Sequence, residues 1–300
     1  MSQRFIIIGA SGFIGSHLYR RLGPESAIAT YHGNPLPGGL QFDAARMRLS
    51  NILEHHRGIT HGFIFHGITS FEACAKDPAG TWKINVASVR TVIDDLAAYG
   101  ITPIFTSSDA VFDGRQGGRT EQDPATPITT YGRQKVEIEE YLSARYSDAI
   151  TVRISKILGT HSGVNDMLGD WIRQLEAGAE IRCAYDHIFS PADIEDIVSA
   201  LISLADRKLH GLFHLCGPEP ISRLDLLNML VGEFRKYRDT ASKIAACSLQ
   251  DFASLEPRPL NTSMSSQKLR AALGMRFKTP REICRQRIAS HFAAISAARN

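Results

Sequence analysis

The sequence predicts an α/β fold built on a doubly wound parallel sheet. Short apolar runs rich in β-branched residues recur along the first half of the chain, as expected of strands buried on both faces. Helical stretches separate these runs, at crossover lengths that suit parallel pairing. The first run, residues 4–9, ends in a glycine turn that is followed directly by a helical pattern.

The predicted elements follow one another in regular order. After the first run, strands are expected at residues 27–31, 62–66, 101–107, 149–154 and 211–215, and helices at 15–22, 79–99 and 131–145. After about residue 158 the pattern changes: helices at 165–178 and 191–205 flank a polar stretch, 181–190, and short helices mixed with loops follow. We therefore expect a domain in residues 1–157, with a return strand near 211–216, and a smaller interleaved α/β substrate domain in 158–300.

Charge and cysteine content narrow the possible functions. The 300 residues include 34 basic and 31 acidic side chains, a net charge of +3, and no block of like charges. This composition gives no support for binding to nucleic acid or to a membrane surface. The five scattered cysteines lack metal-ligand spacing, and the histidines that cluster, His55, His56 and His61, lack the i, i+4 helix context of zinc sites, so we expect a reduced cytoplasmic protein with no metal site.

The turn after the first strand places Gly9, Gly12 and Gly15 at three-residue intervals. The first glycine permits the tight turn, and the second allows the backbone to approach a pyrophosphate. The third allows the helix to pack closely on the sheet, with the phosphates at its positive end. This context predicts a Rossmann domain that binds a nicotinamide dinucleotide through Gly9, Ser11, Gly12, Phe13, Ile14 and Gly15.

The end of the second strand bears on the choice of cofactor. Folds that prefer NAD usually place an acid there to bind the ribose 2′-hydroxyl, but residues 30–33 contain none. His32, Arg20 and Arg21 instead favour the 2′-phosphate of NADPH, with NADH as the alternative. Asp43 is a candidate for contact with the adenine side.

A tyrosine and a lysine lie four residues apart at the start of a helix. The spacing of Tyr131 and Lys135 puts both side chains on one face. An ammonium beside a phenol favours the phenolate, so Lys135 is expected to lower the pKa of Tyr131 and make it a useful proton donor to a carbonyl. Ser108 ends a central strand, where open α/β sheets bind ligands, and is expected to hold the substrate oxygen.

Together, the glycine turn, Ser108 and the Tyr131/Lys135 pair resemble the extended short-chain dehydrogenase/reductases. Asn85 matches the helix asparagine of that family, which supports the active-site lysine through water. Within it, residues 107–114, 186–191 and 258–263 are most similar to the dTDP-4-dehydrorhamnose reductases. The resemblance implies a reductase of a 4-keto-6-deoxy sugar nucleotide that uses NADPH or NADH, in which Tyr131 protonates the ketone and Lys135 also binds the nicotinamide ribose.

The resemblance also suggests substrate contacts and one departure. Asp109, Lys156, Asn165 and Arg258 are candidates for substrate binding. Lys156 stands where the rhamnose-pathway reductases carry a tryptophan, so a cation replaces an aromatic platform for the sugar. Dehydratases of the superfamily carry an Asp-Glu pair after the strand hydroxyl, whereas Asp109 is followed by Ala110, which argues against elimination of water.

Two other functions remain open. A sugar-nucleotide 4-epimerase would use the same serine, tyrosine and lysine but retain NAD, and the missing acid after the second strand counts against it. A non-catalytic dinucleotide-binding regulatory subunit is the other, because the family contains one, the regulatory subunit of methionine adenosyltransferase. Homodimers and a bound magnesium occur among relatives; nothing in the spacing independently indicates either.

Overall fold

The computed structural model describes residues 4–298 and confirms the α/β fold class. Its central sheet has seven strands in the order β11-β6-β5-β4-β1-β2-β3, and the pairs among β3, β2, β1, β4 and β5 are parallel. In chain order these strands are β1 (Arg4–Ile8), β2 (Ala27–Tyr31), β3 (Leu40–Gln41), β4 (Ile59–Ile64), β5 (Thr102–Ser108), β6 (Ile150–Ile154) and β11 (Gly211–Leu215).

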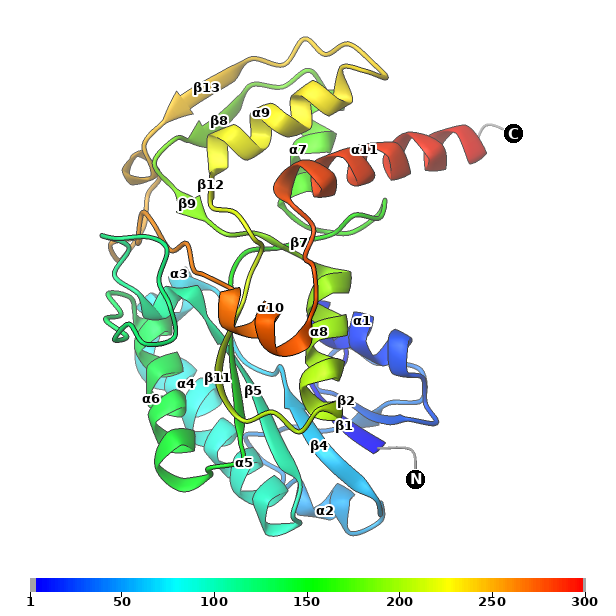
Figure 1. Ribbon diagram of the computed structural model, residues 1–300, viewed down its shortest axis with the longest axis vertical. Coiled ribbons are helices and arrows are strands. Elements are labelled where there is room, and N and C mark those ends of the chain that lie inside the picture. Colours follow the sequence, from blue (N-terminus) through cyan, green and yellow to red (C-terminus); the bar gives the residue numbers. More distant parts are fainter. Residues whose placement is uncertain (1–3, 299–300) are drawn as a thin grey trace. The chain divides into compact units, whose positions relative to one another are not determined.

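Helices cover both faces of this sheet (Figure 1). The long helices α5 (Ser88–Ala98) and α6 (Thr130–Arg145) lie on one side, and α1 (Phe13–Leu22) lies on the other. Apolar side chains of β1 and β4 pack with those of α5 in the core between them. The shorter helices are α2 (Ser50–Leu53), α3 (Phe71–Lys76), α4 (Pro78–Trp82), a π-helical turn (Lys83–Ala87) and a 3-10 turn (Asp109–Val111).

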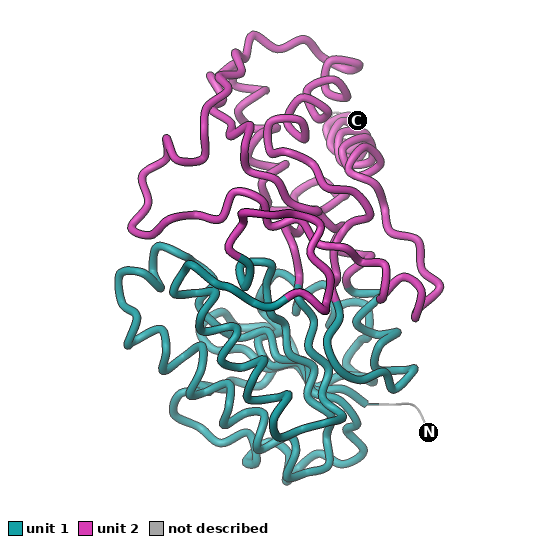
Figure 2. The backbone as a smooth tube through the Cα atoms, turned by 60° about the vertical axis from the view of Figure 1, so that its left-hand side comes forward, with its two compact units in different colours: residues 1–112, 124–153, 198–213 teal, residues 113–123, 154–197, 214–300 magenta. Residues whose placement is uncertain are grey.

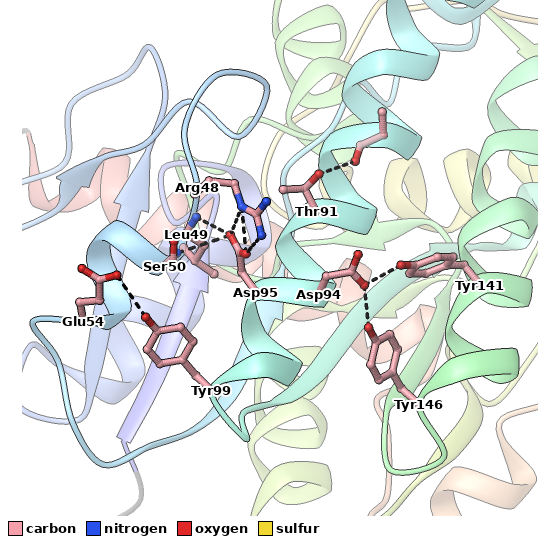
Figure 3. A network of polar contacts seen from close by, with 11 residues as sticks. Arg48, Leu49, Ser50, Glu54, Thr91, Asp94, Asp95, Tyr99, Tyr141 and Tyr146 are labelled. Carbon is pink, nitrogen blue, oxygen red and sulfur yellow. Dashed lines mark hydrogen bonds and ion pairs between the residues drawn. The ribbon is translucent and has the colours of Figure 1, made fainter.

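Two successive acids fix α5 in place. Asp94 and Asp95 point to opposite sides of the helix (Figure 3). Asp95 pairs with Arg48 and accepts a hydrogen bond from the Leu49 amide at 2.7 Å. Asp94 accepts hydrogen bonds from two tyrosine hydroxyls, Tyr141 at 2.5 Å and Tyr146 at 2.6 Å. These contacts attach α5 both to the segment before α2 and to α6, the helix that carries Tyr131 and Lys135.

The chain divides into two interleaved compact units (Figure 2). Unit 1 comprises residues 1–112, 124–153 and 198–213, and unit 2 comprises 113–123, 154–197 and 214–300. The chain therefore leaves the sheet-bearing unit and returns to it more than once. Helix α8 (Ile194–Asp206) begins in unit 2 and continues in unit 1.

Unit 2 contains three small two-stranded sheets and its own core. β7 (Ile157–Leu158) pairs with β10 (Ala192–Asp193), β8 (Ile181–Ala184) with β13 (Ile244–Cys247), and β9 (Ile188–Phe189) with β12 (Ile221–Ser222). Its helices are α7 (Met167–Glu176), α9 (Arg223–Phe234), α10 (Gln267–Leu273) and α11 (Pro280–Ala297), with a 3-10 turn at Leu249–Asp251. Side chains of α7, α9 and α11 form one apolar cluster.

Several elements differ from those predicted. β4 begins and ends before the predicted 62–66, and the predicted helix 79–99 is interrupted by the π-helical turn. The polar stretch 181–190 contains β8 and β9, and the predicted helix 191–205 begins as β10. The long helix α11 replaces an expected mixture of short helices and loops. Within residues 4–298, no helix is both long and apolar enough to cross a bilayer.

Candidate active site

The backbone after β1 has the geometry that the three glycines predict. Gly9 has a φ of +89°, in the region that favours glycine, and a Cβ added there would lie 2.9 Å from the His66 amide nitrogen. A Cβ on Gly15 would overlap the Gly9 carbonyl oxygen and approach the Ala10 Cα to 2.7 Å. The turn and the close approach of helix to strand therefore both require glycine.

At the second glycine, no side chain caps the N-terminal end of α1. Gly12 is exposed and is the N-cap of α1, which has no side-chain cap and no acid in its first turn. Ser11, Phe13 and Ile14 beside it are partly exposed. Backbone amides at a helix start with nothing capping them form an anion site. Pyrophosphate binding by this turn stays a prediction, and its geometry fits.

Two residues predicted to bind the adenosine end of the cofactor lie close together. His32 follows β2, Asp43 follows β3, and the His32 Nε2 atom is 3.6 Å from the Asp43 carboxylate. Arg20 and Arg21, in contrast, fall in the last turn of α1. Because a helix rises 1.5 Å per residue, Arg20 is about 10 Å along the axis from the helix start. Contact of Arg20 and Arg21 with a 2′-phosphate stays a prediction.

Tyr131 and Ser108 meet where α6 begins. Thr129 caps the helix by accepting a hydrogen bond from the Gly132 amide at 3.1 Å. A Cβ on Gly132 would overlap the Ala110 carbonyl oxygen, so only glycine allows the helix start to lie this close to the turn after β5. In this position the Tyr131 hydroxyl forms a hydrogen bond with Ser108. Gly132 is a site residue that the sequence analysis missed.

The expected depression of the Tyr131 pKa is wrong for this arrangement. Burial raises the pKa of Tyr131 well above its ordinary value; the nearby Asp109 carboxylate raises it further, and the hydrogen bond with Ser108 opposes the shift. Ser108 in turn donates to Asp109 Oδ1 at 3.1 Å. The Lys135 ammonium lies 5.6 Å from the centre of the Tyr131 ring and donates to the Thr106 carbonyl, so its charge does not overcome the effect of burial on the Tyr131 pKa. The phenol is consequently held protonated.

Lys135 is buried next to a carbonyl rather than a carboxylate. Its Nζ atom donates to the Thr106 carbonyl oxygen at 2.8 Å and lies 4.7 Å from the centre of the Phe105 ring. Burial lowers the pKa of Lys135 to about 8, although Glu139 acts in the opposite direction. The ammonium therefore loses its proton far more readily than a surface lysine does.

Asn85 lies inside the π-helical turn, where its side chain is fully engaged. Its Oδ1 accepts from the Ile68 amide at 2.7 Å, and its Nδ2 donates to the Ile68 carbonyl at 2.9 Å and to Gln134 Oε1 at 2.7 Å. Gln134 precedes Lys135 in α6. Asn85 thus holds the segment after β4 against the helix of the catalytic pair; its role toward Lys135 through water stays a prediction.

Two buried polar atoms at the carboxyl ends of β4 and β5 have no hydrogen-bond partner within residues 4–298: His66 Nδ1 and Ser107 Oγ. His66 packs on Gly9 and accepts or donates a hydrogen bond with Ser88 Oγ at 3.0 Å. Burial and the neighbouring Lys135 charge lower its pKa to about 4, so the ring is neutral. Sequence reasoning missed both residues, although their places at strand ends are where this fold binds ligands.

In unit 2 the chain brings together two of the segments that carry the resemblance, 186–191 and 258–263, with the last two residues of the third, 113–114. The Ile188 amide donates to the Leu260 carbonyl at 2.7 Å, and the Thr262 amide donates to the Ile188 carbonyl at 2.9 Å. The Asn261 amide donates to the Gly114 carbonyl at 3.0 Å. Segments 113–114, 186–191 and 258–263 therefore form one structural unit.

The remaining candidate substrate residues have different surroundings. Lys156 is exposed between β6 and β7, and Asn165 is exposed in the loop before α7. Arg258 is partly exposed and donates to Ser254 Oγ at 3.2 Å. Among residues 4–298, no group of three or more potential ligands is arranged to hold a metal ion.

Comparison with known families assigns the chain. The model of the family described as RmlD substrate binding domain matches residues 3–292. The chain belongs to this family. A dTDP-4-dehydrorhamnose reductase of Sinorhizobium fredii is 23% identical, over 95% of the chain and 96% of that protein. Methionine adenosyltransferase 2 subunit beta of Rattus norvegicus is 25% identical, over 93% of the chain and 85% of that protein.

Solved structures of the family share the fold. The crystal structure of a dTDP-4-dehydrorhamnose reductase from Bacillus anthracis in complex with NADP superposes with a TM-score of 0.84, at 21% identity. The superposition covers 96% of this chain and 99% of the Bacillus anthracis chain. The RmlD family fold therefore extends over both units of the chain.

Proposed function

We propose that this protein is an NAD(P)H-dependent reductase of a 4-keto-6-deoxy sugar nucleotide. One observation carries the proposal: the protonated, buried Tyr131 phenol forms a hydrogen bond with Ser108, one helical turn before Lys135. A ketone oxygen that displaces this hydrogen bond would meet a proton donor and a second hydroxyl together. Such an arrangement suits general acid catalysis of carbonyl reduction.

The residues around the glycine turn fit a dinucleotide. The uncapped start of α1 suits the pyrophosphate, and the unpartnered His66 Nδ1 and Ser107 Oγ lie at strand ends where a nicotinamide and its ribose would find hydrogen-bond partners. We assign the pyrophosphate to Gly9, Ser11, Gly12, Phe13, Ile14 and Gly15, the ribose to Lys135, and the adenosine end to His32 and Asp43. When bound, NADPH supplies the hydride.

The protein's own groups then perform the proton transfer. Ser108 orients the ketone, and Tyr131 donates its hydroxyl proton to the oxygen as negative charge develops there. The high pKa of Tyr131 keeps this proton in place until the oxygen becomes basic. A positive Lys135 close by stabilises the resulting phenolate, and the buried setting strengthens this interaction.

We further propose that unit 2, which includes Lys156, Asn165 and Arg258, is mainly responsible for binding the nucleotide sugar, and that Asp109 is also a substrate contact. The similarity to dTDP-4-dehydrorhamnose reductases supports this class of substrate. The absence of a second acid after Asp109 favours reduction over elimination of water.

The test is oxidation of NADPH, followed at 340 nm, with dTDP-4-keto-6-deoxy-L-mannose. We expect turnover by the wild type and a loss of about 10²-fold or more in kcat for Tyr131→Phe, the usual scale for a general acid. NADPH affinity should barely change. Tyr237→Phe is the matched control, because Tyr237 is 55% exposed and its ring stacks on Phe292 in unit 2. Near-normal turnover by Tyr131→Phe would contradict the assignment.

Two other outcomes point to the alternatives. Stoichiometric NAD in the purified protein, detected by its absorbance, would favour a 4-epimerase. NADPH binding without turnover of any keto sugar, together with co-purification of a synthetase, would favour a regulatory subunit, a function supported by the similarity to methionine adenosyltransferase 2 subunit beta.

A further inference from the structure

His66 lies between the two parts of the proposed cofactor site in unit 1. It follows β4, which lies between β1 and β5 in the central sheet. On the β1 side its backbone packs against Gly9, where an added Cβ would lie 2.9 Å from the His66 amide nitrogen. On the β5 side Ile64 pairs with Phe105, and the Lys135 ammonium lies 4.7 Å from the centre of the Phe105 ring. The end of β4 is therefore flanked by the glycine turn and by Lys135.

The hydrogen bonds of Ser88 fix the tautomer of His66. Ser88 Oγ donates its single proton to the Ile84 carbonyl at 2.7 Å, one helical turn earlier. The Ser88 oxygen can then only accept from His66 Nε2, which is 3.0 Å away, so this ring nitrogen carries the hydrogen. Burial and the nearby Lys135 charge lower the pKa of His66 to about 4, which keeps the ring neutral. In a neutral ring with Nε2 protonated, Nδ1 is a hydrogen-bond acceptor.

This acceptor has no donor of its own. His66 Nδ1 is buried and has no hydrogen-bond partner in the chain between residues 4 and 298. Buried polar atoms are nearly always paired because an unpaired one is costly, so the exception indicates a donor that a ligand would supply. Lys135 Nζ, an ammonium with several hydrogens, donates one of them to the Thr106 carbonyl at 2.8 Å. The two side chains offer an acceptor and a donor, which suits neighbouring hydroxyls, since a hydroxyl both donates and accepts.

The order of the strands indicates which hydroxyls these are. A nicotinamide dinucleotide runs from adenosine through the pyrophosphate and a second ribose to the nicotinamide ring. We assign the pyrophosphate to the turn after β1, and the reacting carbon to the end of β5, where Tyr131 and Ser108 meet. The ribose between them then belongs at β4, the strand between β1 and β5. Resting on the proposed function, we propose that His66 binds the nicotinamide ribose, with Nδ1 accepting a hydrogen bond from a ribose hydroxyl beside Lys135.

Two substitutions separate the roles of the ring nitrogens. His66→Gln places an amide as far from Cα as Nε2, so it can reach Ser88 but has no acceptor at the Nδ1 position. His66→Asn places an amide oxygen as far from Cα as Nδ1 and loses the contact with Ser88. We expect His66→Gln to weaken NADPH binding about fivefold or more, the scale of one hydrogen bond. His66→Asn should bind NADPH more tightly than His66→Gln does. Isothermal titration calorimetry measures both.

A series of ligands shows where the affinity is lost. NADPH is compared with 2′-phospho-ADP-ribose, which lacks the nicotinamide, and with 2′-phospho-ADP, which lacks the nicotinamide ribose as well. His66→Gln should weaken the first two and leave the third within about twofold. The third ligand also reports whether the glycine turn is still folded. The series is repeated with NADH, ADP-ribose and ADP. His55→Gln is the matched control, because His55 is exposed in the turn after α2, and it should bind every ligand as the wild type does.

The outcomes are distinct. Equal weakening of all three ligands by His66→Gln would overturn the inference, because the histidine would then act on the glycine turn. Unchanged NADPH affinity in His66→Gln, or a larger loss in His66→Asn, would overturn it as well. Turnover of the keto sugar by the wild type would in each case leave the proposed reductase standing. Failure of the wild type to bind either dinucleotide would contradict both proposals.

Discussion

Two largely buried lysines, one in each unit, have opposite surroundings. Lys135 in unit 1 donates to a neutral carbonyl, and burial lowers its pKa to about 8. Lys278 in unit 2 is also partly buried, which lowers its pKa, but hydrogen bonds with Asp193 and Asp196 at 2.7 and 2.9 Å more than reverse this effect and raise it.

The difference separates a structural charge from a functional one. Lys278 neutralises Asp193, which is fully buried, and ties the segment before α11 to the start of α8. Among the described residues, Lys135 Nζ donates to the Thr106 carbonyl and to no carboxylate, so its charge is available to a phenolate and to a ribose. A buried lysine whose only hydrogen-bond acceptor is a carbonyl is costly to the fold, which is the pattern expected of active sites.

The largest expected effect is on stability. Lys278→Met leaves the Asp193 carboxylate buried without a counter-charge, so the free energy of unfolding should fall by about 3 kcal/mol, measured by urea denaturation of the full chain. Lys278→Arg, which keeps the charge, should recover much of the loss. Lys135→Met should cost less, because it removes a poorly solvated charge; if it costs as much as Lys278→Met, the contrast between the two lysines fails.

The next effect concerns the turn beside Lys135. Gly12 has an ordinary extended backbone and an added Cβ there meets only the Gly9 carbonyl, at 3.3 Å, so Gly12→Val should fold. Its side chain would cover the helix start and weaken NADPH binding about tenfold or more. Gly12→Ala, with a smaller side chain, should show a smaller loss. Fluorescence titration with NADPH measures both; undiminished binding would refute the placement of the phosphates.

The smallest effect is a pH dependence. Lys135 is protonated below its pKa of about 8 and neutral above it. If its charge serves the reaction, kcat/KM, which reports the free enzyme, should fall by about half at pH 8 and then about tenfold per pH unit. Thermal melting at pH 9 would show whether the fold persists. A flat profile to pH 9.5 in folded protein would mean that the ammonium is not required.

Where the sequence predicted the fold well, the physical signal was unambiguous. β2 and β11 have the predicted bounds, because each is a short apolar run between polar residues or turns. β4 was placed too late because its first residue, Ile59, is followed by two polar residues, Thr60 and His61, that the strand largely buries. β8 was missed because Arg182, which is exposed in a small two-stranded sheet, made the stretch resemble a polar loop.

Other features depend on tertiary contacts that a sequence pattern does not contain. The structure places Tyr131 beside Ser108 and one helical turn before Lys135, as the spacing predicts, but the direction of the Tyr131 pKa shift depends on burial and on Asp109. His66 and Ser107 are distinguished only because each has one buried polar atom, Nδ1 and Oγ respectively, without a hydrogen-bond partner among the described residues. The start of α11 was predictable: Thr279 and Glu282 form a capping box with Pro280 in the first turn.

The last strand of the central sheet comes late in the chain. β11 is an outer strand whose Gly211 amide donates to the Ala149 carbonyl, next to β6, yet residues 155–210 separate the two strands along the chain. During synthesis β6 therefore remains an unpaired edge strand until about sixty more residues have emerged. Its hydrogen-bonding groups are exposed to other chains during that time. Any truncation before residue 211 would make that exposure permanent, so aggregation rather than simple loss of activity is the expected fate of such fragments.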